Sequence, residues 1–186
     1  MADFDINHSA SILDSEDMIG FTRAFVEDIR KGLNAVNVER YPWIEEIGNG
    51  QWQGVLALGM GGSAAGGDFL SSICDLKGSI PVVVQRDYVI PAWWNEQWLV
   101  IATSHSGNTE EAIEASEIAL KLGATVIVIS TGGILSGLAE LHYNCYLIPS
   151  IGGQPPRSAF GHIFARQLAL FRCLGCLLYT SPSPRD

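Results

Sequence analysis

Basic residues are scarce in this chain. Lysine and arginine number 11, against 20 aspartates and glutamates, so the formal net charge at pH 7 is -9. The few basic residues form no cluster in the sequence, which disfavours nucleic acid and anionic membranes as partners. An anionic ligand would therefore have to be held by local dipoles and a few well-placed cations, against the overall field of the protein.

Long apolar runs are also missing. The first five residues, MADFD, are acidic and lack the basic start and apolar centre of a signal peptide. The longest apolar stretch, near residues 168–179, is too short to span a bilayer and contains Arg172. We therefore expect a cytoplasmic protein without a membrane anchor.

Cysteine is sparse as well, with four residues scattered over segments that we expect to be buried: Cys74, Cys145, Cys173 and Cys176. We interpret them as reduced core residues, typical of a reducing compartment. The pair Cys173 and Cys176 has the spacing of a redox motif, but it falls late in an apolar helix, where a redox function is disfavoured.

What the sequence does contain is an alternation of strand and helix patterns. Short apolar runs predict strands at residues 55–58, 81–85, 98–103, 125–130 and 145–149. Helices are expected at 15–36, 63–76 and 110–120, after the fourth strand, and at 158–176, with Asp14 or Ser15 capping the first and Ser158 the last. This alternation predicts an α/β fold with a parallel sheet covered on both faces.

Three polar turns follow strands of this predicted sheet, at residues 59–63, 104–109 and 152–157. Because ligands of such sheets bind beyond the carboxyl ends of the strands, we expect the three turns to face one pocket. In the first turn, Gly61 and Gly62 would let backbone N–H groups approach a ligand, and Ser63 adds a hydroxyl.

The central turn, SHSGNT, is the richest in hydroxyl groups. Ser104, Ser106 and Thr109 meet at a predicted helix N-terminus, which is a favourable place for a phosphate group. The plainer interpretation is a helix cap formed by Asn108 or Thr109. We expect His105 to point away from the ligand.

Two further interpretations stay open at this point. Arg157, in the third turn, is either a surface charge or a cation that meets negative charge developing on a substrate oxygen. The string from Gly59 to Ala64 also fits the loose dinucleotide-binding fingerprint, with Asp87 as the acid that would bind a ribose.

The motifs GMGGSA (59–64), SHSGNTEE (104–111) and QPPRSA (154–159), with RDY at 86–88, resemble the sugar isomerase (SIS) domain. They are most similar to the amino-terminal half of bifunctional phosphoglucose/phosphomannose isomerases. The resemblance implies a three-layer αβα sandwich with a five-stranded parallel sheet. It also implies that Ser63, Ser104, Ser106 and Thr109 hold a substrate phosphate and that Arg157 steadies an enediolate. The reaction implied is aldose–ketose isomerisation in carbohydrate metabolism (glycolysis, gluconeogenesis), without metal or nicotinamide, in a protein that is a homodimer at full length.

The chain also departs from that family. The resemblance implies a second SIS domain, carrying a glutamate base and a histidine that opens the sugar ring, and nothing after Gly175 looks like one. We therefore expect a leader at 1–14, a SIS domain at 15–176, a tail at 177–186 that is not native to the family, and little or no turnover by this fragment. A non-catalytic sugar-phosphate sensor, an isomerase of another phosphosugar, and a nucleotide-binding oxidoreductase domain are the alternatives.

Overall fold

A five-stranded, wholly parallel sheet forms the centre of the molecule. The computed structural model describes residues 5–177. The strands are β1 (Gly54–Leu58), β2 (Val82–Gln85), β3 (Trp98–Ser104), β4 (Val126–Ser130) and β5 (Cys145–Pro149). Their order in the sheet is β2-β1-β3-β4-β5, and the parallel sheet confirms the predicted α/β class. Each strand begins and ends within one residue of its expected bounds.

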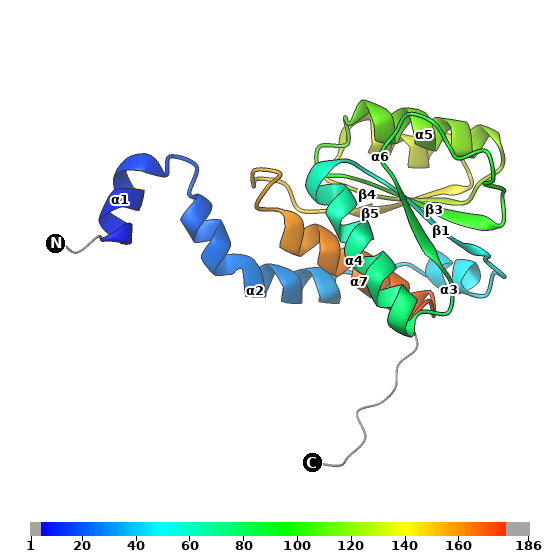
Figure 1. The fold of residues 1–186 in the computed structure, drawn as a ribbon, viewed down its shortest axis with the longest axis horizontal. Helices are drawn as coiled ribbons and strands as arrows, with labels where there is room; N and C mark the ends of the chain where they lie inside the picture. The colour runs from blue at the N-terminus through cyan, green and yellow to red at the C-terminus, as the bar shows by residue number, and fades with distance from the viewer. Residues whose placement is uncertain (1–4, 178–186) are drawn as a thin grey trace, which may run out of the picture.

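Helices cover both faces of the sheet, so the architecture has three layers (Figure 1). One layer holds α5 (Glu110–Lys121) and α6 (Gly133–Leu141). The other holds α2 (Met18–Asn34), α3 (Trp43–Gly48), α4 (Gly61–Lys77) and α7 (Phe160–Cys173). The sequence pattern predicted all of these except α3, which begins after Pro42.

The central strands are apolar on both faces because each face packs on a helical layer. In β3, Leu99 and Ile101 belong to the core under α7 and α4, whereas Val100 and Ala102 belong to the core under α5 and α6. All four side chains are almost fully buried. This two-sided burial is the reason that the strands appear in the sequence as continuous apolar runs.

The first strands set the geometry of the functional edge. β1 pairs with β2 on one side and with β3 on the other, both parallel. The chain leaves β1 toward one edge of the sheet and later builds the other half from β3. The turns after β1 and β3 therefore diverge at the point where strand order reverses, and this point favours a ligand crevice.

The N-terminal region differs from its prediction in two ways. Residues assigned to a leader include a further helix, α1 (Ile6–Leu13), which buries none of its residues and lies away from the sheet (Figure 1). α2 begins at Met18 instead of residue 15. Its cap position is Asp17, whose side chain makes no capping bond, so the predicted cap position was wrong. The Asp14 carboxylate nevertheless accepts hydrogen bonds from the backbone N–H groups of Met18 and Ile19, both at 2.8 Å.

The prediction for the last helix was wrong at its start. α7 begins at Phe160, its cap position is Ala159, and Ser158 makes no capping hydrogen bond. The Ser158 hydroxyl instead donates to the carbonyl oxygen of Pro155 at 2.9 Å, which tightens the turn before the helix. The helix also ends at Cys173, three residues early. The expectation of a tail at 177–186 falls, apart from Leu177, outside the described residues.

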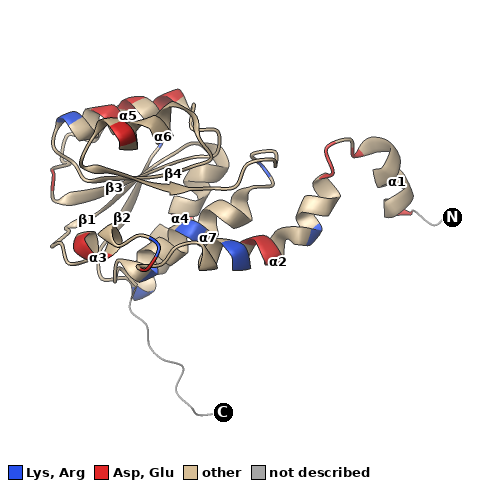
Figure 2. Ribbon diagram, turned by 180° about the vertical axis from the view of Figure 1, so that it is seen from behind, with Lys and Arg blue, Asp and Glu red and all other residues tan. Residues whose placement is uncertain are grey.

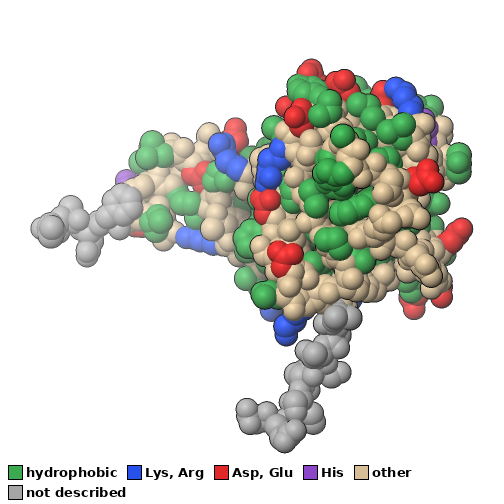
Figure 3. Space-filling view, turned by 45° about the vertical axis from the view of Figure 1, so that its right-hand side comes forward, with side chains coloured by type: hydrophobic (Ala, Val, Ile, Leu, Met, Phe, Trp, Pro, Cys, Tyr) green, Lys and Arg blue, Asp and Glu red, His purple; other side chains and the backbone are tan. Residues whose placement is uncertain are grey.

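The acidic residues and the cysteines are distributed as the composition suggests. Acidic residues lie along α5 (Figure 2), and acidic side chains are spread over the face seen in Figure 3 without forming one patch. The four cysteines are free thiols, and burial raises the pKa of Cys145 and of Cys176 to about 12. Among the residues described, no helix has the length and apolar character needed to cross a bilayer.

Candidate functional site

A cavity of about 400 Å³ opens where the turns after β1 and β3 meet the segment that leads into α7. Its lining residues come from all three polar turns: Met60, Gly61, Gly62, Ser63, His105, Ser106, Thr109, Pro156 and Arg157. Six of the seven site residues predicted from the sequence are among them. The seventh, Ser104, lies beneath the cavity.

The first turn presents the N-terminus of α4 to the cavity. No side chain caps this helix, so the N–H groups of its first residues stay available to a ligand. Gly61 has a φ of 53°, a conformation that other residues adopt with strain. Gly62 borders open space, since an added Cβ would meet only the Pro156 carbonyl oxygen, at 4.0 Å. Gly62 thus leaves room at the cavity. Close packing against Gln167 explains why a glycine stands at position 66, but no such packing occurs at Gly62.

The second turn is held in shape by buried hydrogen bonds. The Ser104 hydroxyl is 2.8 Å from the hydroxyl of Thr109 and accepts a bond from the Gly107 N–H at 3.0 Å. Thr109 occupies the cap position of α5 but makes no capping bond with its side chain. Asn108 does not cap the helix either, because its side-chain oxygen accepts from the Ile134 N–H. The plain interpretation of this turn as a helix cap is therefore wrong.

The same turn is braced by the neighbouring turn after β4. The Thr131 N–H and hydroxyl both donate to the carbonyl oxygen of His105, at 3.1 and 2.7 Å. The Leu135 N–H donates to the carbonyl oxygen of Gly107 at 2.9 Å. Ser106 is left exposed at the tip, where its hydroxyl can reach a ligand.

Arg157 supplies the cation of the cavity. Its side chain is 73% exposed, and its guanidinium lies 3.7 Å from the Glu16 carboxylate, which is also exposed. An ion pair between two exposed groups at this distance contributes at most about 1 kcal/mol, so it restrains Arg157 only weakly. The guanidinium remains available to an anion in the cavity.

The segment before Arg157 is fixed by a chain of polar contacts that the sequence did not reveal. The carbonyl oxygen of Gln154 is 3.0 Å from Nε2 of His105, and the amide of Gln154 donates to the Asp28 carboxylate at 3.1 Å. Asp28 in turn lies 3.1 Å from Nε2 of His162, and both side chains are almost fully buried. These contacts link α2 and α7 to two of the three turns.

His162 is held in its neutral form. Burial lowers the pKa of this imidazole and outweighs the nearby Asp28 carboxylate, which acts in the opposite direction. Nδ1 of His162 is buried without a hydrogen-bond partner among the described residues, so a proton there would have no acceptor. The neutral ring donates from Nε2 to Asp28, and the pair has a structural role at the base of the site.

Three lining residues were missed or discounted in the sequence: Met60, Pro156 and His105. Met60 and Pro156 are direct neighbours of predicted residues, so position in the motif is their only signal. His105 was expected to point away from the ligand, yet it lines the cavity while its Nε2 contacts Gln154. Asp87, the acid required by the dinucleotide fingerprint, is not a lining residue; its carboxylate accepts from the N–H of Tyr88.

The arrangement can bind a dianion. Amide groups at the start of α4, hydroxyls from Ser63, Ser106 and Thr109, and the Arg157 guanidinium converge on a space of small-molecule size. None of the nine lining residues carries a carboxylate. Within residues 5–177, no three acidic, histidine or cysteine side chains are grouped so that they could hold a metal ion.

Part of this chain is similar in sequence to known proteins. A bifunctional phosphoglucose/phosphomannose isomerase of Caldicellulosiruptor bescii is 46% identical over 124 residues, which cover 66% of this chain and 36% of that protein. The isomerase of the same name from Thermoplasma volcanium is 41% identical over 114 residues, covering 61% and 35%. In sequence, the chain is similar to part of the bifunctional phosphoglucose/phosphomannose isomerases. The matched region spans about a third of their length. No protein-family model matches the chain.

Solved structures share the fold of this chain. The tagatose-6-phosphate ketose/aldose isomerase of Escherichia coli superposes with a TM-score of 0.59 at 20% identity, over 79% of this chain and 46% of that one. The Vibrio vulnificus NanR protein, complexed with ManNAc-6P, superposes with a TM-score of 0.63 at 18% identity, over 89% and 64%. At these identities the likeness concerns the fold, and it confirms the three-layer α/β architecture.

Proposed function

We propose that this chain is a SIS domain that binds the substrate of an aldose–ketose isomerase. This isomerase would interconvert glucose 6-phosphate or mannose 6-phosphate with fructose 6-phosphate. The observation that carries the proposal is the convergence of three separate turns on one cavity of about 400 Å³. Homology to bifunctional isomerases supports the choice of sugar phosphate as the ligand.

The phosphate group would bind at the N-terminal ends of α4 and α5. The Ser63, Ser106 and Thr109 hydroxyls and the amides of Gly61 and Gly62 surround that position. A hydrogen bond to a charged group contributes about 1.5–3 kcal/mol, so a few such bonds suffice to anchor a small phosphorylated molecule. Ser104 would act indirectly, by holding the Thr109 hydroxyl and the Gly107 N–H in place.

Isomerisation moves a proton between C1 and C2 of the open-chain sugar, through an enediolate with negative charge on oxygen. Arg157, at the mouth of the cavity, would stabilise that charge. A base must lie within hydrogen-bond reach of the proton that it removes, and the lining residues include no carboxylate. We therefore expect these 186 residues to bind the sugar phosphate and to turn it over slowly or not at all.

A calorimetric titration with fructose 6-phosphate tests the binding. The Ser106→Ala/Thr109→Val variant should bind at least about tenfold more weakly than the unsubstituted chain, since two hydroxyl contacts to a dianion are lost. Ser72→Ala is the matched control, because Ser72 is an exposed residue of α4, outside the cavity, whose hydroxyl donates to the Asp68 carbonyl oxygen. Equal affinities for the two variants would contradict the proposal.

The same titration separates the alternatives. Binding of NADP in place of fructose 6-phosphate would favour the oxidoreductase domain. An assay of fructose 6-phosphate isomerisation by the 186 residues tests for an enzyme as against a sensor. Robust turnover by the 186 residues would show that the base lies within this chain.

A further inference from the structure

Positive charge is concentrated around a second cavity, which is separate from the first. This cavity has a volume of about 630 Å³ and lies between the end of α2, the turn after β5 and α7. Four of the chain's 11 basic residues line it: Arg30, Lys31, Arg40 and Arg166. It shares no lining residue with the first cavity. Figure 2 shows the basic segments of α2 and α7 next to one another.

Arg166 is the unusual member of this group. It is 3% exposed, and it donates from Nε to the Pro149 carbonyl oxygen and from Nη1 to the His162 carbonyl oxygen, both at 3.1 Å. A guanidinium has five N–H donors, so three remain after these two bonds. Burial is the main cause that lowers the pKa of Arg166; the neighbouring Arg40 lowers it further, whereas Tyr41 acts in the opposite direction.

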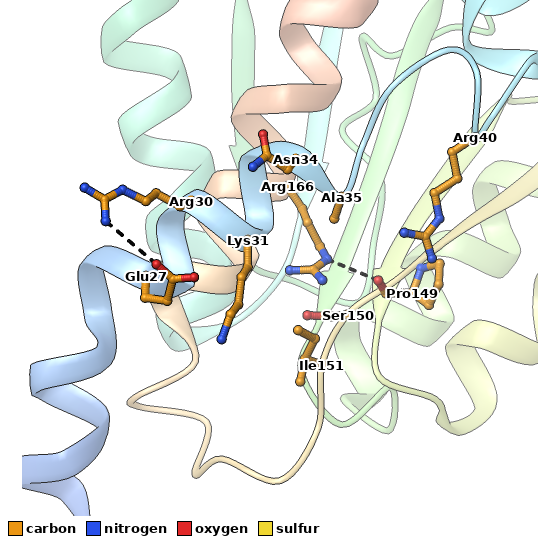
Figure 4. A pocket seen from close by; sticks show the side chains of 10 residues that line it. All are labelled: Glu27, Arg30, Lys31, Asn34, Ala35, Arg40, Pro149, Ser150, Ile151 and Arg166. Carbon is orange, nitrogen blue, oxygen red and sulfur yellow. Dashed lines mark hydrogen bonds and ion pairs between the residues drawn. The ribbon is translucent and has the colours of Figure 1, made fainter.

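No carboxylate compensates that charge. Within the described part of the chain, Asp and Glu form no ion pair with Arg166, Lys31 or Arg40. The one acid in the lining, Glu27, pairs with Arg30 at 3.7 Å, and this pair lies to one side of Arg166 in Figure 4. A buried charge without a partner is strongly destabilising in proteins, so a bound anion would relieve a cost that the fold already carries.

An orphaned hydroxyl points to the same place. The Ser150 Oγ lines this cavity and is buried without a hydrogen-bond partner in residues 5–177. In Figure 4, Ser150 and Arg166 lie side by side, with Lys31 on one side and Arg40 on the other. A hydroxyl, a guanidinium and an ammonium group are together suited to an anion with several oxygens.

We propose that this cavity is a second anion-binding site, which takes the phosphate group of a small phosphorylated molecule through Arg166, Ser150, Lys31 and Arg40. A phosphate offers three strong acceptor oxygens and nearly two negative charges at neutral pH, so it can meet all of these groups at once. A single carboxylate offers two oxygens and one charge. The site does not depend on the function proposed for the first cavity.

Inorganic phosphate is the probe for the test, followed by amide chemical shifts in NMR of the whole chain. The Ser150 and Ile151 amides should shift saturably, with a dissociation constant of about 1 mM or tighter. The Lys31→Gln/Arg40→Gln variant should bind at this position at least about tenfold more weakly, since two charge-assisted contacts are lost. Both residues are exposed, so the substitutions should leave the fold intact.

The matched control is Lys77→Gln/Lys121→Gln, which removes the same charge from exposed positions on α4 and α5 and should change the affinity less than about twofold. Phosphate in the first cavity would shift Gly62 and Ser106 instead, equally in both variants. Absence of a shift at Ser150 and Ile151, or equal affinities of the two double variants, would overturn the proposal. Tighter binding of citrate than of pyrophosphate would overturn the assignment to phosphate.

Discussion

Gly107 is the residue of the central turn that should tolerate substitution least. Its φ is 72°, where a side chain introduces strain of roughly 1–2 kcal/mol. A Cβ at this position would lie 2.7 Å from the Ser130 hydroxyl and from the carbonyl carbon of Gly132, and closer still to that carbonyl's oxygen. Carbon–oxygen contacts lie at about 3.3–3.6 Å, so the backbone would have to move by roughly 1.5–2 Å to relieve the contact with the Gly132 carbonyl oxygen.

The Gly107→Ala variant should therefore lose both stability and binding. Strain together with overpacking predicts a loss of about 2–5 kcal/mol in the free energy of unfolding, measured by urea titration. Because Ser106 and Thr109 flank Gly107, a displacement of this size should also weaken fructose 6-phosphate binding by about tenfold or more, measured by calorimetry.

Gly137→Ala is the matched control. Gly137 lies within α6, and an added Cβ there would have open space around it. Alanine in a helix interior is more favourable than glycine, so this variant should gain about 0.5–1 kcal/mol and bind normally. If Gly107→Ala unfolded at the same urea concentration as the unsubstituted chain and bound the sugar phosphate equally well, the account of a rigid, preformed turn would be wrong.

Three further predictions concern single side chains. Arg157→Gln should weaken the binding of a hydroxamate analogue of the enediolate by about tenfold and the binding of fructose 6-phosphate by less. The reason is that the guanidinium contacts a negative charge that the ground state lacks. Equal weakening of binding for both ligands would argue against that role. Ser104→Ala should lower the free energy of unfolding by about 1–3 kcal/mol in urea, since the buried Gly107 N–H loses its acceptor; an unchanged midpoint would exclude this positioning role. The unsubstituted chain should lose stability as the pH falls below 6.5, by at most about 1.4 kcal/mol per pH unit from His162, because its pKa is lowered on folding and the unfolded state binds more protons there. That slope should flatten in His162→Gln and persist in His8→Gln, an exposed histidine, when urea unfolding is compared at pH 7.5 and 5.5.

Most of the fold was predictable because its signals are local. The strands are buried on both faces, so each is a continuous apolar run in the sequence. Helix α5 is predicted directly by the spacing of its apolar residues. The glycines and hydroxyls of the turns were equally visible, and the parallel topology then brought them to one edge of the sheet.

The features that escaped prediction depend on contacts between distant segments. Asp28 looks like one of many helical acids until the fold places it against His162 and Gln154. Arg166 looks like a surface charge within an apolar helix, yet it is buried against the carbonyl oxygen of Pro149. Ser158 was expected to be a cap because its type and position fit, but its hydroxyl donates to the Pro155 carbonyl oxygen and Ala159 takes the cap position.

The bracing of the turn after β3 by the turn after β4 has a consequence for protein engineering. The hexapeptide at 104–109 is shaped in part by Thr131, Ile134 and Leu135, which donate hydrogen bonds into it. A transplant of the six residues alone into another parallel-sheet scaffold should give a floppy loop with little affinity for phosphate. The transferable unit is the pair of adjacent turns, together with the first residues of α6.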